Sequence, residues 1–137
     1  MIDLQPKICN LCGGKVEYVP NAQIYGKSYG SGWCYHCCEC GAYVGTHKPR
    51  PREALGILAN KEMQQWKIWC HSLFDSFWRG KNKANCKRNR LYARLAKDMD
   101  IEQRECHFGY FDVPKLKRAY AVMKQWQKID SNTFWSE

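Results

Sequence analysis

The feature of this sequence with the clearest chemical meaning is a repeated cysteine motif. Cys-x-x-Cys-Gly occurs at residues 9–13 and again at residues 37–41. Two thiolates three residues apart can bind one metal ion from a single turn, and four complete the tetrahedral shell that Zn²⁺ prefers. A glycine after the second cysteine permits the positive φ with which such a turn directs N–H groups toward sulfur. The spacing therefore predicts one structural zinc ion, held by Cys9, Cys12, Cys37 and Cys40.

Two other side chains compete for the third position of this ligand set. Cys34 lies six residues before Cys40, a spacing similar to that in the C-terminal zinc ribbons of bacterial type I topoisomerases, and His36 offers a nitrogen ligand. We favour Cys37 because it repeats the first motif, and Cys34 remains the alternative. Four thiolates leave no open position for water, so a structural rather than a catalytic zinc ion is expected.

The distribution of cysteines also bears on the cellular compartment. Six of the nine cysteines lie in the first 40 residues. Disulfide frameworks spread paired cysteines along a secreted chain, whereas short clustered spacings are typical of metal ligands in a reducing compartment. The first residues contain no apolar stretch that resembles a secretory signal, and no run approaches the roughly 20 apolar residues of a membrane span. We expect a cytoplasmic protein of a bacterial cell, with no membrane partner.

Length and composition narrow the classes of protein further. The chain has 137 residues, 45% of them hydrophobic and 14% aromatic, which is sufficient for a folded core and excludes a disordered chain. The length suits one small module with a helical body rather than a large multi-domain enzyme. Twenty-two Lys and Arg against 13 Asp and Glu give a net charge of +9, which favours a polyanionic partner.

The segment between the cysteine motifs has the pattern of a small β-structure. Strand-like stretches at 15–19, 23–25 and 32–35 are separated by Pro20-Asn21 and by a glycine-rich turn at 26–32. This pattern predicts a β zinc ribbon over residues 1–48. The basic, proline-punctuated segment 46–53 is expected to be extended and to mark the boundary with the rest of the chain.

Apolar residues at three- and four-residue steps predict a helical body over residues 49–128. One helix is expected from Asn60, as N-cap, to about residue 78, a second over 84–99, and a third from about Pro114 to 128 with Asp112 or Val113 at its cap. The tail, 129–137, is expected to be loose. The predicted fold is therefore α+β, with a ribbon and about three helices packed as one compact unit.

The basic residues and the ribbon aromatics predict binding of DNA or RNA without strong sequence readout. Four cations on the second helix step by three, four and three residues and so share one face. Such a row neutralises phosphates, while aromatic rings on a ribbon stack on unpaired bases. The candidate nucleic-acid contacts are Lys87, Arg90, Arg94, Lys97, Lys117, Lys124, Tyr29 and Trp33.

Two alternative functions remain open at this stage. A metal-dependent nuclease would draw its catalytic residues from His47, His71, Asp75 and His107, because His71 and Asp75 lie four apart on one helix and are neighbours. The same residues can instead form a structural cluster bonded to carbonyl groups. A small basic protein can also act by binding and modulating a host protein.

Several segments resemble a known family. Residues 40–47 (CGAYVGTH), 55–60 (LGILAN), 71–78 (HSLFDSFW), 91–96 (LYARLA) and 106–112 (CHFGYFD) are similar to segments of a phage and prophage family described as a zinc-finger-containing domain of unknown function. The resemblance covers about residues 9–123. It implies a phage-associated zinc protein and brings no established activity with it.

Overall fold

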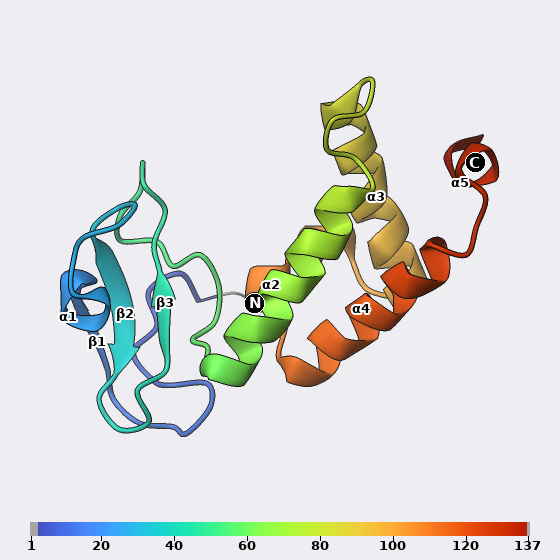
Figure 1. Cartoon of the computed structure of the whole chain (residues 1–137). Helices are drawn as coiled ribbons and strands as arrows, with labels where there is room; N and C mark the ends of the chain where they lie inside the picture. Colours follow the sequence, from blue (N-terminus) through green and yellow to red (C-terminus); the bar gives the residue numbers. More distant parts are fainter. Residues whose placement is uncertain (1–2, 137) are drawn as a thin grey trace. The chain divides into compact units, whose positions relative to one another are not determined.

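Three short antiparallel strands form the N-terminal part of the computed structural model, which describes residues 3–136. They are β1 (Val16–Pro20), β2 (Trp33–Cys37) and β3 (Tyr43–Gly45), in the order β1-β2-β3 (Figure 1). Side chains alternate between the two faces of a strand. One face of β2 therefore carries its odd-numbered residues and the other its even-numbered residues, a division that decides which cysteines meet.

The expected second strand is a single helical turn. Residues 22–25 form α1 (Ala22–Tyr25), which ends at Gly26 with a φ of 82°. The buried Asn21 amide holds the following loop, because it donates to the Tyr29 carbonyl at 2.7 Å and accepts from the Tyr29 N–H at 3.2 Å. Such side-chain bonds to a loop backbone compete with the extended conformation. The third strand lies instead after the second cysteine motif.

The proline-punctuated segment 46–53 is folded into turns rather than extended. The N–H of His47 donates to the Glu53 carbonyl at 3.0 Å, and that of Glu53 donates to the Arg50 carbonyl at 2.9 Å. The segment also packs on the sheet, because the hydroxyls of Tyr18 and Tyr35 donate to carbonyl oxygens within it at 2.6 and 2.5 Å. Prolines remove backbone donors but leave the carbonyls available, and the tyrosines supply the missing partners.

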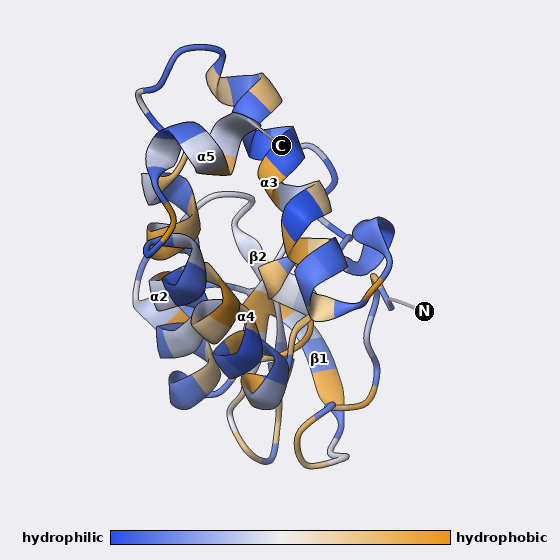
Figure 2. Cartoon of the chain, turned by 90° about the vertical axis from the view of Figure 1, so that its right-hand side faces the viewer, coloured by the Kyte–Doolittle hydropathy of each residue, from blue (hydrophilic) through white to orange (hydrophobic). Residues whose placement is uncertain are grey.

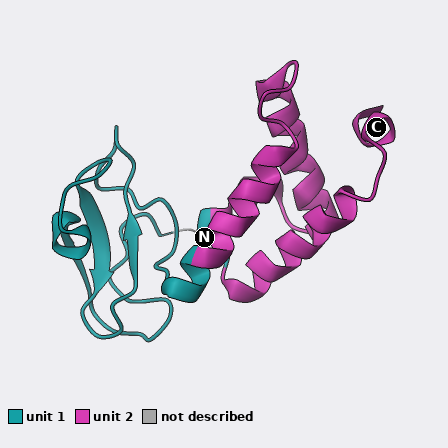
Figure 3. Cartoon of the chain, viewed as in Figure 1, with its two compact units in different colours: residues 1–64, 109–111 teal, residues 65–108, 112–137 magenta. Residues whose placement is uncertain are grey.

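The chain divides into two compact units (Figure 3). The first, here named the sheet unit, runs to residue 64 and includes residues 109–111. The second, the helical unit, contains residues 65–108 and those from 112 onward. The composition change near residue 48 is therefore not where the units part. Ala54 and Leu58 are fully buried in the core of the sheet unit, so the chain beyond the basic segment still belongs to it.

Three helices confirm the sequence-based helical pattern. They are α2 (Lys61–Ser76), α3 (Ala84–Met99) and α4 (Val113–Trp126). Asn60 and Asp112 act as the expected N-caps, accepting backbone N–H groups of Met63 and Lys115 at 2.9 and 3.0 Å. Hydrophilic and hydrophobic bands alternate along these helices (Figure 2), as they do in helices that bury one face. Within residues 3–136, no helix has the length and apolarity needed to cross a membrane.

The tail expected to be loose over residues 129–137 is folded as far as residue 136, and residue 137 lies outside the described residues. Residues 131–136 form α5 (Ser131–Ser136), and two 3₁₀ turns, η1 (Gln103–Glu105) and η2 (Phe108–Tyr110), precede α4. Phe134 is only 5% exposed, and its ring lies 5.5 Å from that of Trp126 and 5.7 Å from that of Phe77. The buried ring of Phe134 thus helps to seat α5 on the helical unit.

Candidate metal centre and aromatic surface

The four cysteines of the two repeated motifs converge at one point of the sheet unit. The Sγ atoms of Cys9, Cys12, Cys37 and Cys40 all lie within 4.8 Å of one another. The Cys9–Cys40 and Cys12–Cys37 sulfur pairs are 3.7 and 3.4 Å apart. Tetrahedral zinc with Zn–S bonds of about 2.3 Å requires sulfur separations of about 3.8 Å. The thiols therefore already have nearly the spacing of a zinc shell.

The two motifs form the same turn twice. In each, the glycine N–H donates to the carbonyl of the first cysteine, from Gly13 to Cys9 at 2.9 Å and from Gly41 to Cys37 at 3.2 Å. In each, the N–H two residues after the first cysteine lies 3.4 Å from its sulfur. Both glycines have a φ near 80°, at 76° and 80°. The local sequence Cys-x-x-Cys-Gly thus suffices to build each half of the centre.

The electrostatics of the cluster favour a bound cation. The backbone N–H groups of Cys40 and Glu39 point at the Cys37 sulfur and lower the pKa of its thiol to about 6. The Gly14 N–H acts in the same direction on Cys12, but the neighbouring Cys37 sulfur and burial raise the pKa of Cys12 to about 12. Four thiolates at these distances repel one another unless a cation lies between them. Residues 3–136 contain no second group of three or more His, Cys, Asp or Glu ligands close enough for a metal ion. The cluster fits one structural zinc ion, as expected.

Strand alternation explains why Cys37 rather than Cys34 belongs to this cluster. The two residues are three apart on β2 and therefore project from opposite faces. Cys34 is fully buried, and His36 lies on the same face as Cys34. Cys38 is exposed and stands outside the four-sulfur group, although it sits within the second motif. The preference for Cys37 over the alternative ligands is confirmed.

The proposed histidine–carboxylate pair on α2 has other partners. The Asp75 carboxylate accepts hydrogen bonds from the Trp78 indole and the Arg79 guanidinium, both at 3.0 Å. The His71 ring packs edge-on against Phe108, with ring centroids 4.9 Å apart. Partial burial in this apolar setting lowers the pKa of His71 below 6.5, although the charge of Asp75 opposes the shift. These contacts are those of side chains that pack near the C-terminal end of α2.

The other two histidine candidates lie on different elements. His47 belongs to the sheet unit, where its backbone joins the turn at 46–53, and His107 belongs to the helical unit just before η2. The His107 ring lies 5.8 Å from the Tyr92 ring, between centroids. No metal-binding group includes any of these histidines in the part of the chain that the structure describes.

The cationic row on α3 is occupied in part by the end of the chain. The Arg94 guanidinium donates to the Phe134 carbonyl at 3.2 Å, and that of Arg90 donates to the Trp135 carbonyl at 3.0 Å. The Lys87 ammonium lies 5.2 Å from the centre of the Trp135 ring. Sequence reasoning did not anticipate this contact because the row looked solvated and the tail looked loose.

The remaining predicted nucleic-acid contacts lie in three places. On α4, Lys117 and Lys124 are exposed, and the Lys117 ammonium lies 5.8 Å from the Trp66 ring. Tyr29 contacts the Tyr25 ring edge-on at 5.5 Å. Trp33, although only four residues from Tyr29, is part of a separate aromatic group described next.

A stacked pair of rings lies on β1 and β2, of which the sequence analysis had named Trp33 but missed Tyr18. The rings of Tyr18 and Trp33 are 4.9 Å apart and nearly parallel, with an interplanar angle of 4°. The Arg52 guanidinium lies 5.2 Å from the centre of the Tyr18 ring. Trp33 is 38% exposed. The signal lay in the two-residue alternation of aromatics on the strands and in the basic segment 46–53, whose fold back onto the sheet only the structure shows.

Comparisons with known proteins agree with the metal centre. Neither the search of curated proteins nor that of solved structures gave a match. A family model described as a zinc-finger-containing domain matches residues 5–126, which include all four clustered cysteines and most of the helical unit. Because this match spans most of its length, the chain belongs to the family of zinc-finger-containing domains.

Proposed function

We propose that this protein binds single-stranded nucleic acid, DNA or RNA, and that its zinc ion serves only to hold the ribbon. The observation that carries the proposal is the stack of Tyr18 and Trp33, with Arg52 beside it. Exposed aromatic rings next to cations are the usual means of binding unpaired bases, because every base has a face that can stack. We also place the protein in a reducing cytoplasm, where its thiols stay available to the metal.

The charges around this stack support the same conclusion. The segment 46–53 supplies three cations, Lys48, Arg50 and Arg52, against one carboxylate, Glu53, which pairs with Arg50 at 3.2 Å. The two tyrosine hydroxyl bonds described above hold this segment against the aromatic face. Phosphates of a strand stacked on Trp33 would therefore meet fixed cations rather than mobile ones.

The test is fluorescence anisotropy of a labelled ten-nucleotide single strand, with the zinc-loaded chain and a salt series. Trp33→Ala is expected to weaken binding about 5- to 150-fold, which corresponds to the about 1–3 kcal/mol of one stacked base. Trp69→Ala is the matched control, because Trp69 is also an exposed tryptophan, at 46%, but lies on α2. Replacing Lys48 and Arg52 by Gln should reduce the salt slope by about 1.4 if each contacts one phosphate.

Equal losses in Trp33→Ala and Trp69→Ala would refute the assignment to the ribbon. Absence of binding at low salt would refute the function itself and favour the alternative, a protein partner. For that alternative the exposed apolar residues Ile68 (61%) and Trp69 on α2 are the candidate contacts. Metal-dependent cutting of the strand in the same samples would instead favour the nuclease hypothesis.

A further inference from the structure

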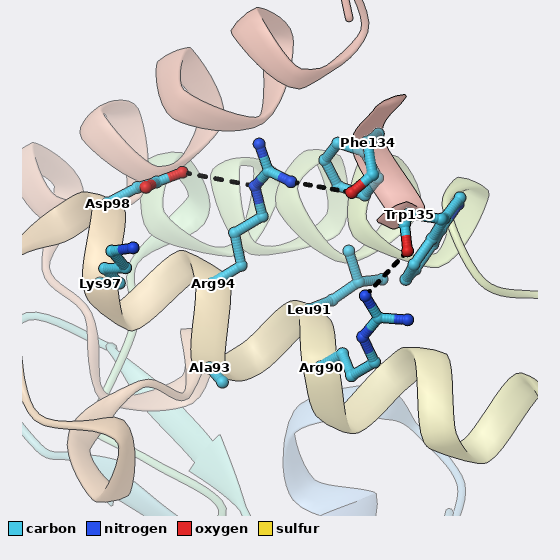
Figure 4. A pocket seen from close by; sticks show the side chains of 8 residues that line it. All are labelled: Arg90, Leu91, Ala93, Arg94, Lys97, Asp98, Phe134 and Trp135. Atoms are coloured by element: carbon cyan, nitrogen blue, oxygen red, sulfur yellow. Dashed lines mark hydrogen bonds and ion pairs between the residues drawn. The ribbon is translucent and has the colours of Figure 1, made fainter. Parts of the chain in front are cut away.

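A cavity of about 270 Å³ between α3 and α5 combines an apolar wall with a cationic rim (Figure 4). Leu91 forms part of its floor, the Trp135 ring forms a wall, and Arg90, Arg94 and Lys97 line its rim. All of these residues belong to the helical unit, well apart in sequence from the ribbon aromatics. The volume lies just below the usual range for ligand pockets, about 300–1,000 Å³, so the cavity suits one small ligand.

The aromatic wall is held in place before any ligand binds. Phe134, next to Trp135, is buried against the rings of Phe77 and Trp126 and anchors α5. Arg90 and Arg94 bond the last-turn carbonyls of α5, which carry the negative end of the helix dipole. A ligand would therefore not have to order this wall, which lowers the entropic cost of binding.

The charge of the lining favours an anion. The lining contains three cations of α3 and one carboxylate, that of Asp98. This carboxylate already has two partners within the helical unit. It pairs with Arg94 at 3.8 Å and accepts the Trp126 indole N–H at 2.9 Å. The exposed ammonium of Lys97 adds a compact point charge at the rim, the kind of group that binds phosphate.

We propose that this cavity binds a single nucleotide, with the base against Trp135 and the phosphate at the rim formed by Lys97 and the two arginines. A nucleotide joins a planar ring to an anionic group, and so matches a site that is apolar on one side and cationic on the other. Inorganic phosphate would contact only the cationic rim, and an uncharged nucleoside only the apolar wall. This inference deepens the proposed function, since the nucleotide is either free or the end of a bound strand.

The first experiment titrates the zinc-loaded full chain with adenosine 5′-monophosphate, adenosine and inorganic phosphate, followed by ligand-detected NMR. We expect the nucleotide to bind at least tenfold more tightly than either fragment. Trp135→Leu should weaken nucleotide binding at least fivefold, with Trp69→Leu as its matched control. Lys97→Gln should remove most of the preference for the nucleotide over adenosine, with Lys115→Gln, an exposed lysine on α4, as its control.

Several outcomes would overturn the proposal. The first is equal binding of adenosine and its monophosphate, and the second is no binding at millimolar nucleotide. The third is a Lys97→Gln variant that binds the nucleotide no differently from Lys115→Gln. Because Trp135→Leu can unseat α5, its effect counts only if amide exchange of residues 131–136 is unchanged, and Lys97→Gln tests the proposal regardless.

A second arm separates the two sources of the nucleotide and the two proposals. A 5′-phosphorylated ten-nucleotide strand is compared with the same strand lacking that phosphate. Tighter binding of the phosphorylated strand, lost in Lys97→Gln, assigns the cavity to a strand end; equal binding of the two strands assigns it to free nucleotide. Trp33→Ala should leave monophosphate binding unchanged, so failure of the ribbon proposal and failure of the cavity proposal give different patterns.

Discussion

Replacing Cys12 by Ser should remove the zinc ion and unfold the ribbon. The core that the metal supports is small, with four large apolar residues, Val16, Tyr35, Val44 and Leu58, at its centre. At about 1.5–3 kcal/mol for each buried side chain, these contribute about 6–12 kcal/mol in total. A structural zinc site contributes an apparent 10–16 kcal/mol or so at pH 7. The zinc ion thus contributes at least as much free energy of folding as these four core side chains together. The sheet should therefore unfold when the zinc ion is lost.

The assay combines zinc content with amide exchange. The parent protein should contain one zinc ion per chain, and Cys12→Ser close to none. Amides of β1, β2 and β3 should lose their protection in the variant, whereas those of α3 and α4 should keep theirs, because these helices belong to the other compact unit. Chelation of zinc from the parent protein should give the same pattern.

Two further cysteine variants make this prediction refutable. Cys38→Ser lies within the second motif but outside the sulfur cluster, so it should keep both zinc and protection. Cys34→Ser should destabilise the sheet, because Cys34 is fully buried, yet keep the zinc ion. Retention of one zinc ion with unchanged exchange in Cys12→Ser, or zinc loss in Cys38→Ser, would refute the assigned ligand set.

Three other perturbations test the packing. Gly56→Ala should destabilise the sheet unit by about 3–5 kcal/mol in thermal unfolding, because the new Cβ would lie 1.9 Å from the Gly109 carbonyl oxygen; an unchanged melting temperature would contradict this contact. Burial lowers the pKa of Lys67 from 10.5 to about 8, so between these values the unfolded chain binds more protons at this residue. Lys67 should therefore contribute a rise in stability from pH 8 to 10.5, against the fall contributed by buried thiols such as Cys70, whose pKa burial raises. Lys67→Met should abolish that rise and, with the partial exposure of Lys67 discounted, add about 1–2 kcal/mol at pH 7 in urea unfolding. Phe134→Ala should release α5, seen as lost amide protection confined to residues 131–136, and protection equal to the parent's would show that α5 does not depend on this side chain.

Features with local causes were predictable from the sequence. Each zinc turn needs only Cys-x-x-Cys-Gly, in which the glycine takes a positive φ and N–H groups reach sulfur within a few residues. The helices α2, α3 and α4 follow from apolar periodicity and from the caps Asn60 and Asp112, which act within one turn. The choice between Cys34 and Cys37 was also open to sequence reasoning, because it depends on the two-residue alternation of a strand.

The candidate binding surfaces depend on contacts between distant residues, and only the tertiary structure decided them. The segment 46–53 lies beside the aromatic stack because Tyr18, some 30 residues earlier, bonds its backbone. The row of cations on α3 has an aromatic wall because Phe134 is buried some 40 residues after Arg94. The sequence by itself determined the two zinc turns and the helices α2, α3 and α4, since short-range geometry dictates them. Which cations stand beside which rings was decided by packing, because burial of single aromatic side chains outweighs the local preference of a polar segment for solvent.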